Sequence, residues 1–307
     1  MTASVTVIRP GMLTTVQDLG RWGYQASGVP VAGPMDLYSH RLANRIVGNP
    51  DSAAALEITL LGPELESGGE VVCALRGAEF AVTVRGHVVD TTGPFVVPPD
   101  ARVRFGARGA GARATLAVRG GFDAPPVMGS RAVSLVSRIG PLGGRPLKAG
   151  DVLPVATPAD THARSAGQAL LMPRGGARVR VILGPHDAMF TREGVATLLR
   201  SRYIVTPDSN RMGYRLDGPR LHYSGADVLS DATPIGSLQV PASGYPILLM
   251  ADRQTTGGYP RIGTVISADL PLAGQLAPGD WIEFAACTRA AAITALKEQE
   301  VRLSGAR

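Results

Sequence analysis

Short apolar runs rich in Val, Ile and Leu recur along nearly the whole chain, and Gly, Pro, Asp or Asn bounds each of them. Examples are SVTVIRP, GEVVCALRG, ARVRVILGP, YPILLMAD and DWIEFAA. Runs of this length with such boundaries are typical of short antiparallel strands. The 38 glycines and 24 prolines interrupt the chain at short intervals, so few long helices are expected. The pattern predicts a mostly β protein built from barrels or sandwiches.

Only three segments have the three- and four-residue spacing of an amphipathic helix. They cover residues 35–47, 188–199 and 290–301. The first is followed by Gly48-Asn49-Pro50, a sequence that commonly ends a helix. We therefore expect a helix at 35–47 as the longest of the first half, a shorter one at 188–199, and a helical tail.

Three short landmarks occur in the same order in both halves of the chain. They are Leu61-Gly62-Pro63 with Leu183-Gly184-Pro185, Gly120-Gly121-Phe122 with Gly257-Gly258-Tyr259, and Gly150-Asp151 with Gly279-Asp280. The order suggests a tandem duplication of one β-barrel, and accidental matches in a Gly-rich chain are the alternative.

Domain limits follow from composition. The stretch 157–176, rich in Pro, Ala, Gly and Arg, is the best linker between the halves. We expect an N-terminal β-rich subdomain over 1–165, which carries the 17–36 loop and the 35–47 helix. A β-barrel over 166–288 and a helical tail over 289–307 complete the organisation.

Charge and hydropathy exclude several classes of protein. The chain has 31 Lys and Arg, only Lys148 and Lys297 being lysine, and a net charge of +6. These cations are scattered and form no basic stripe with interleaved aromatic residues, which disfavours nucleic-acid binding. No apolar run is long enough for a membrane span, and the first ten residues lack the pattern of a signal peptide. The expected location is the cytoplasm.

Several kinds of catalytic site also lack support. With two lysines there is no Walker phosphate loop, and no serine-nucleophile motif is present. The five histidines are never closely paired and no carboxylate cluster suggests a metal cage, so no metal is expected. Cys73 and Cys287 lie in apolar strand-like contexts and are predicted to be buried free thiols. Neither lysine has the sequence context of a biotin attachment site.

Polar residues gather in four turn-like stretches, where loops on a rigid β scaffold usually carry function. The first, 14–36, contains Gln17 and Asp18 among four glycines. Glycine lets backbone amides approach a ligand closely. The alternative is a surface loop whose acidic residues cap turns and the following helix.

Two further stretches offer planar recognition groups. In DSNRMGYRLDG, Arg211 and Arg215 flank Gly213-Tyr214 and could present guanidinium forks to a carboxylate or a phosphate. The alternative is a strand edge with exposed arginines. In PIGSLQVPASGY, the amide of Gln239 could read an amide edge with both a donor and an acceptor, and the alternative is an ordinary hairpin.

The fourth stretch is the densest. DRQTTGGYPR, residues 252–261, directly follows the apolar run ILLMA. A strand that ends abruptly in Asp, Arg, Gln and Thr, followed by two glycines, is hard to explain by packing. This stretch favours a functional site.

At these residues the chain resembles a known family. TTVQDLGRWGYQASGVPVAGPMD, SNRMGYRLDGP, PIGSLQVPASGYPILLMADRQTTGGYP and LAPGDWIEF occur in the order and at the spacing typical of biotin-dependent carboxyltransferase subdomains A and B. The family is also called allophanate hydrolase subunit 2. The resemblance runs over residues 5–284 and implies a cyclophilin-like β-barrel with an associated β-rich subdomain.

The resemblance leaves three activities open. It implies most directly the C subunit of an ATP-dependent 5-oxoprolinase, which hydrolyses 5-oxoproline to glutamate with a subdomain C/D companion (the B-type subunit) and a third, A-type subunit. The alternatives are a carboxyltransferase component that acts on urea-like amides, or a non-catalytic antagonist of a kinase inhibitor. ATP would be used by the complex, and biotin is not attached to this chain.

The resemblance also implies a site shared with the companion. In the hypothesis, Asp252 acts as a general base or orients the substrate, and Gln254 and Thr255 form hydrogen bonds with its amide. Arg211 and Arg215 bind a carboxylate or phosphoryl group. The resemblance also implies Tyr259, Tyr214, Gly257 and Gly258 as site residues. The polar stretches add Gln239, Gln17 and Asp18 as candidates for substrate binding. Arg261 stands where many family members have lysine, so a neutral amine base is not expected there. Asp252→Asn is expected to reduce activity and leave stability intact.

Overall fold

The computed structural model describes residues 3–158, 167–224 and 228–305. The chain forms two compact units. Unit 1 comprises residues 1–21, 32–172 and 301–307, and unit 2 comprises 22–31 and 173–300. The boundary expected at 165/166 falls on residues 159–166, outside the described part, and the expected domain limits stay a prediction.

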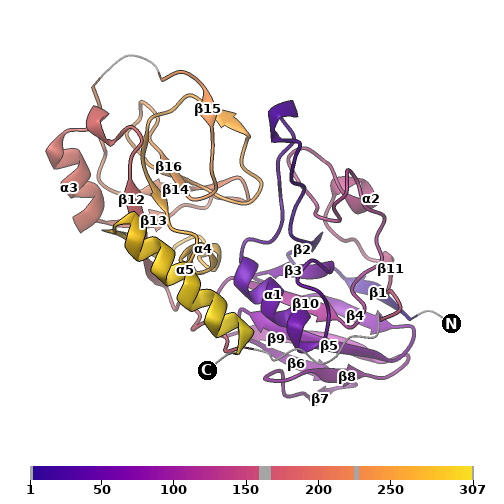
Figure 1. The fold of residues 1–307 in the computed structure, drawn as a ribbon. Coiled ribbons are helices and arrows are strands. Elements are labelled where there is room, and N and C mark those ends of the chain that lie inside the picture. Colours follow the sequence, from indigo (N-terminus) through magenta and orange to yellow (C-terminus); the bar gives the residue numbers. More distant parts are fainter. Residues whose placement is uncertain (1–2, 159–166, 225–227, 306–307) are drawn as a thin grey trace. The chain divides into compact units, whose positions relative to one another are not determined.

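Unit 1 contains two antiparallel sheets (Figure 1). The six-stranded sheet has the order β11 (Val152–Pro154), β1 (Ser4–Arg9), β4 (Glu64–Ser67), β9 (Arg102–Arg108), β6 (Phe80–Val84) and β7 (His87–Val88). The five-stranded sheet has the order β2 (Leu13–Gln17), β3 (Ala55–Thr59), β10 (Arg113–Val118), β5 (Val71–Gly77) and β8 (Phe95–Val97). Alternate residues of both sheets, such as Val7, Val82, Leu56 and Leu116, form one hydrophobic core.

Helix α1 (Leu37–Ile46) packs on the five-stranded sheet and matches the helix expected at 35–47. Asp36 caps it by accepting a hydrogen bond from the backbone N–H of Ser39 at 2.8 Å. Ala43 and Val47 contact one alanine from each of three strands, namely Ala55, Ala74 and Ala117. Such small side chains allow the helix to approach the sheet closely.

Unit 2 is a closed seven-stranded barrel. Its order is β12 (Gly176–Leu183), β19 (Arg261–Val265), β16 (Ser237–Gln239), β17 (Ile247–Leu249), β14 (Gly213–Asp217), β13 (Arg202–Val205) and β20 (Trp281–Ala286). A parallel pairing of β20 with β12 closes the barrel, while the other pairings are antiparallel. A two-stranded sheet of β15 (Asp231–Ala232) and β18 (Thr256–Gly257) also belongs to this unit.

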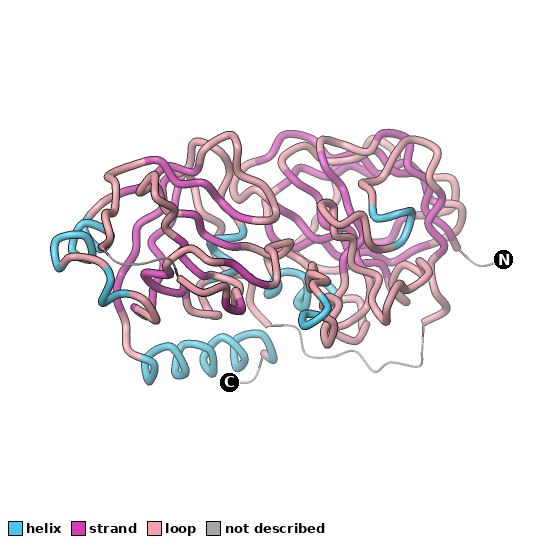
Figure 2. Tube along the Cα trace, turned by 90° about the horizontal axis from the view of Figure 1, so that it is seen from above, coloured by secondary structure: helices cyan, strands magenta, loops and turns pink. Residues whose placement is uncertain are grey.

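Helices are few in the described chain (Figure 2). Unit 1 has the short α2 (Pro141–Gly144), and unit 2 has α3 (Arg192–Arg200), α4 (Leu270–Gly274) and most of α5 (Arg289–Ser304). Single turns of 3₁₀ helix occur at η1 (Gln25–Ser27) and η2 (Asp187–Met189). The predicted mostly β class and the helices near 188–199 and 290–301 are confirmed, with the ends shifted by a few residues.

The structure corrects the expectation of a duplicated barrel, because unit 1 has two sheets and unit 2 has one closed barrel. The landmark pair Gly150-Asp151 and Gly279-Asp280 does share a local turn. In each, glycine has a positive φ, +87° and +91°, and the aspartate accepts from the backbone N–H three residues earlier, at 2.7 Å and 2.8 Å. The match reflects turn chemistry rather than a common topology.

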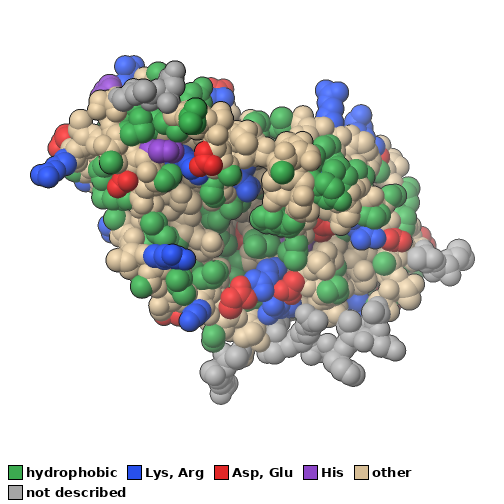
Figure 3. All heavy atoms as spheres, turned by 45° about the horizontal axis from the view of Figure 1, so that its top comes forward, with side chains coloured by type: hydrophobic (Ala, Val, Ile, Leu, Met, Phe, Trp, Pro, Cys, Tyr) green, Lys and Arg blue, Asp and Glu red, His purple; other side chains and the backbone are tan. Residues whose placement is uncertain are grey.

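Figure 3 shows Lys and Arg side chains at several places on the face drawn, some of them directly beside Asp or Glu side chains. Within the described residues, no helix has the length and apolar character needed to cross a bilayer.

Candidate functional site

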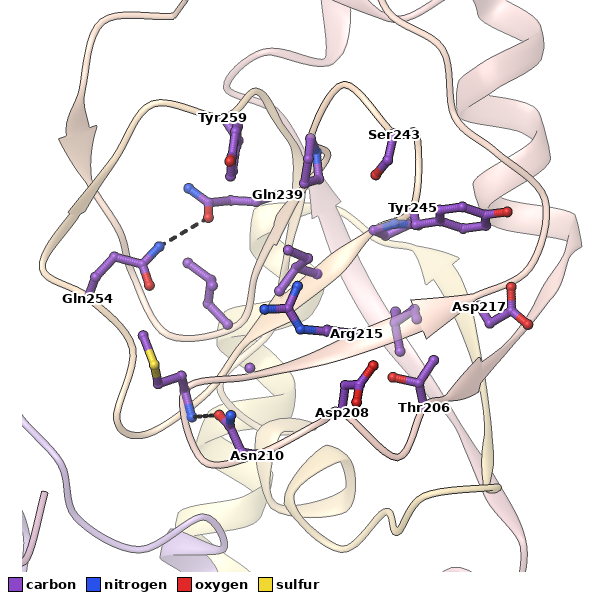
Figure 4. A pocket seen from close by; sticks show the side chains of 17 residues that line it. Thr206, Asp208, Asn210, Arg215, Asp217, Gln239, Ser243, Tyr245, Gln254 and Tyr259 are labelled. Carbon is purple, nitrogen blue, oxygen red and sulfur yellow. Dashed lines mark hydrogen bonds between the residues drawn. The ribbon is translucent and has the colours of Figure 1, made fainter. Parts of the chain in front are cut away.

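A cavity of about 710 Å³ lies over three neighbouring barrel strands, β14, β17 and β16 (Figure 4). Side chains alternate between the two faces of a strand. Tyr214 and Leu248 are buried in the barrel, so Arg215 and Ile247 point to the opposite, outer face. The lining residues are Thr206, Asp208, Asn210, Met212, Gly213, Arg215, Leu216, Asp217, Gln239, Pro241, Ser243, Tyr245, Pro246, Ile247, Leu249, Gln254 and Tyr259.

Strand register brings two of the predicted recognition groups onto this face. Arg215 on β14 and Gln239 on β16 are both direct partners of Ile247 on the strand between them. Direct cross-strand partners project to the same side of a sheet, and two strand spacings separate their Cα atoms by roughly 10 Å. A guanidinium and an amide therefore flank the apolar Ile247 at the floor of the cavity.

A second amide supports Gln239. Gln254 Nε2 donates to Gln239 Oε1 at 3.3 Å (Figure 4). Gln239 is 1% exposed, and its Nε2 has no hydrogen-bond partner among the described residues. A buried polar atom without a partner costs free energy unless a ligand or water satisfies it. Whichever way the amide is oriented, one polar atom of Gln239 remains for such a ligand.

Arg211 and Asp252 form a buried bidentate ion pair beside the cavity without lining it. Arg211 Nε and Nη2 donate to Asp252 Oδ2 and Oδ1 at 3.1 Å and 3.0 Å, and the two side chains are 4% and 0% exposed. The backbone N–H of Asp252 also donates to the Arg211 carbonyl at 2.8 Å. The pair links the turn before β14 to the loop after β17, which carry Asn210 and Gln254.

The predicted site residues thus separate into groups. Arg215, Gln239, Gln254 and Tyr259 line the large cavity. Thr255 lines a smaller cavity of about 210 Å³ together with Gln254. The catalytic roles assigned to these residues stay a prediction.

The remaining candidates have other surroundings. Tyr214 is 1% exposed, and its hydroxyl donates to the Leu276 carbonyl at 3.3 Å. In unit 1, Gln17 Nε2 donates to Thr15 Oγ1 and the Val133 carbonyl, both at 3.0 Å. Asp18 accepts from Ser130 Oγ at 2.6 Å and from backbone N–H groups of Gly20 and Arg131.

Several lining residues were not singled out from the sequence, namely Thr206, Asp208, Asn210, Asp217, Ser243 and Tyr245. All but Thr206 lie inside the predicted polar stretches. The sequence did not show which side chains of each stretch point toward the cavity. The Thr206 hydroxyl is buried without a hydrogen-bond partner among the described residues. Thr206 ends the apolar run Tyr203-Ile204-Val205, so the sequence around it did not suggest a polar site.

Arg261 has a structural role in the barrel. Its guanidinium donates to the Ala232 carbonyl at 2.8 Å and pairs with Asp231, so it holds β15 in place. Its side chain is 9% exposed.

The described residues contain no group of three or more His, Cys, Asp or Glu placed to hold a metal ion. Cys73 and Cys287 are free thiols, as predicted, but only Cys73 is buried; the predicted burial is wrong for Cys287, which is half-buried. Burial raises the pKa of the Cys73 thiol to about 12, so this group is not a nucleophile near neutral pH.

Gly257 is required for the amide arrangement. A Cβ at this position would lie 2.6 Å from Gln239 Nε2, 3.2 Å from Thr233 Cγ2 and 3.4 Å from Gln254 Nε2. Gly257→Ala is therefore expected to displace the Gln239 amide. Because the nearest atom ends a flexible side chain, the loss of unfolding free energy should stay within about 1 kcal/mol.

The side-chain amide signals of Gln239 and Gln254 in an NMR spectrum provide the measurement, and denaturant unfolding gives the stability. Gly93→Ala is the matched control, since nothing lies within 4 Å of a Cβ there. Unshifted amide signals in Gly257→Ala would contradict the expected close approach.

The chain is similar in sequence to a known family and to several characterised proteins. Residues 27–286 match the family described as carboxyltransferase domain, subdomain A and B. The 5-oxoprolinase C subunit of Escherichia coli (strain K12) is 40% identical over 297 residues, which cover 96% of this chain and 94% of that protein. A urea amidolyase of Lachancea kluyveri is 35% identical over 305 residues, 91% of this chain and 16% of that protein.

Solved structures agree. The K. lactis urea amidolyase has a TM-score of 0.92 at 31% identity, with 97% of this chain and 20% of that chain covered. The family match spans most of the sequence, and both units take part in the structural match. The chain therefore belongs to the carboxyltransferase domain, subdomain A and B, family.

Proposed function

We propose that this chain is the C subunit of an ATP-dependent 5-oxoprolinase, which acts with a subdomain C/D companion and a third protein. The observation that carries the proposal is the end-to-end similarity to the E. coli protein of that name, with 94% of that protein covered. A second 5-oxoprolinase C subunit, from Haemophilus influenzae, is 33% identical and covered over 93% of its length. In the urea amidolyase relative, the corresponding region is 16% of a longer protein.

The large cavity suits a small amide better than a nucleotide. Its volume lies within the usual range of about 300–1,000 Å³ for ligand sites. Its charged lining residues are Arg215, Asp208 and Asp217, so the carboxylates outnumber the single cation. A triphosphate would be repelled by this balance, and we assign ATP binding to the rest of the complex, in the cytoplasm.

Within the complex, this chain would bind and orient the substrate. A lactam nitrogen is non-nucleophilic and its carbonyl oxygen is a weak base, so ring opening depends on activation and exact placement of the amide. Gln239 and Gln254 offer amide hydrogen bonds on one wall of the cavity. Asp252 acts by holding the loop that carries Gln254, because both of its oxygens already accept from Arg211.

Reconstitution tests the proposal. The chain is purified alone and together with its two partner proteins, and 5-oxoproline-dependent ATP hydrolysis and glutamate release are measured. We expect turnover with all three proteins and none with this chain alone. Absence of turnover in the full complex would refute the proposal, and turnover by the pure chain would refute a shared site.

Urea serves as the second substrate in the same assay, since the structural similarity to urea amidolyase makes urea-like amides the competing class. We expect no urea-dependent ATP hydrolysis. Turnover of urea in preference to 5-oxoproline would show that the complex acts on urea-like amides instead.

A further inference from the structure

We propose that the outer-face cavity binds a small cyclic amide that carries a carboxylate, with Arg215 taking the carboxylate and Gln239 the amide edge. This inference rests on the proposed function and names the groups that select its substrate. It assigns the two ends of the ligand to β14 and β16, the two strands that flank β17.

Arg215 is available for a carboxylate. Its side chain is exposed in the cavity and makes no ion pair or hydrogen bond with any described residue. Figure 4 shows it in the middle of the lining residues, with Gln239 and Gln254 on one side and Asp208 and Asp217 on the other. A planar guanidinium binds a carboxylate with two parallel hydrogen bonds. The two aspartates disfavour a second negative group on the ligand.

Gln239 supplies the second point of recognition. Its buried, unpartnered Nε2 needs an acceptor, and a lactam carbonyl provides one. A lactam presents an N–H donor beside that carbonyl, so its edge pairs with a primary amide in either orientation. The contact from Gln254 holds the Gln239 side chain in place before the ligand arrives.

The floor of the cavity fits the rest of such a ligand. Ile247 lies between Arg215 and Gln239 in the strand register, and Leu249 follows on the same face. Aliphatic ring carbons would cover these apolar side chains while the polar ends reach the two flanking strands. Urea has neither the carboxylate nor the ring carbons, so the same cavity discriminates against it.

Three ligands separate the two contacts: 5-oxoproline, which has both groups; 2-pyrrolidinone, the lactam without the carboxylate; and cyclopentanecarboxylate, the carboxylate without the amide. Binding to the full chain and to the assembled complex is followed by ligand-observed NMR titration. Arg215→Gln should weaken 5-oxoproline and cyclopentanecarboxylate about tenfold or more and leave 2-pyrrolidinone unchanged. Gln239→Met should weaken 5-oxoproline and 2-pyrrolidinone and leave cyclopentanecarboxylate unchanged.

Arg178→Gln is the matched control, because Arg178 is an exposed arginine on β12 outside the cavity lining. Circular dichroism verifies that each variant is folded, and Gln254→Met replaces Gln239→Met if the latter is not. In the complex, Arg215→Gln should raise the KM for 5-oxoproline more than it lowers kcat.

The outcomes distinguish the inference from the proposed function. Equal losses for all three ligands, or no binding by chain and complex, overturn the inference even if the complex hydrolyses 5-oxoproline. The crossed pattern of losses with an inactive complex would support the inference and refute the proposed function.

Discussion

Asp252→Asn is expected to lower the free energy of unfolding by about 3 kcal/mol or more, because it leaves the Arg211 charge buried without its counter-ion. Both side chains are almost fully buried and share two hydrogen bonds. Breaking a buried pair typically costs about 3–5 kcal/mol, since the remaining charge is neither hydrated nor neutralised. This replaces the expectation from the sequence alone that the substitution would leave stability intact.

Denaturant unfolding of the purified chain measures the effect. Asp123→Asn is the matched control, because Asp123 is 58% exposed in an ion pair with Arg131 and such pairs contribute at most about 1 kcal/mol. The double variant Arg211→Met/Asp252→Leu should recover much of the loss, since apolar replacement removes both buried charges. Equal effects of Asp252→Asn and Asp123→Asn would contradict the buried-pair interpretation.

The free energy of unfolding is expected to fall by about 3 kcal/mol as the pH is lowered from about 6.5 to about 4, because of His40. Burial lowers the pKa of His40 from 6.5 to about 4, and it outweighs the opposing charges of Asp18 and Asp51. In that pH range the unfolded chain binds the proton and the folded chain does not. Protonation therefore stabilises the unfolded state.

Unfolding curves at several pH values test this effect. His40→Gln should flatten the dependence between pH 6.5 and 4, whereas His87→Gln, on the exposed strand β7, should leave it unchanged. Asp51 acts in a separate range. Burial would raise the pKa of Asp51, but hydrogen bonds and charges from Arg45 and Arg41 lower it to about 2, so its contribution is lost only below about pH 4. An undiminished slope in His40→Gln would contradict the assignment.

The sequence predicted much of the site because its polar residues follow strands that the barrel brings together. Three of the four polar stretches contribute to the large cavity, and the motifs of the resemblance contain most of its lining. The choice among residues within a stretch was less reliable. Arg211 and Arg215 are the same residue type four positions apart, yet one is 4% exposed in an ion pair and the other is open to the cavity.

The amino-acid sequence by itself determined the mostly β class, the family and several local features. These local features are the α1 helix with its Asp36 cap and the turns at Gly150-Asp151 and Gly279-Asp280. Each depends on residues close together along the chain or on a long motif. Only the tertiary structure decided the difference in topology between the units, the parallel pairing of β20 with β12, and the face on which each polar side chain lies. Strand partners far apart along the chain set the register, and a shift of one residue would move Arg215 and Gln239 to the barrel interior.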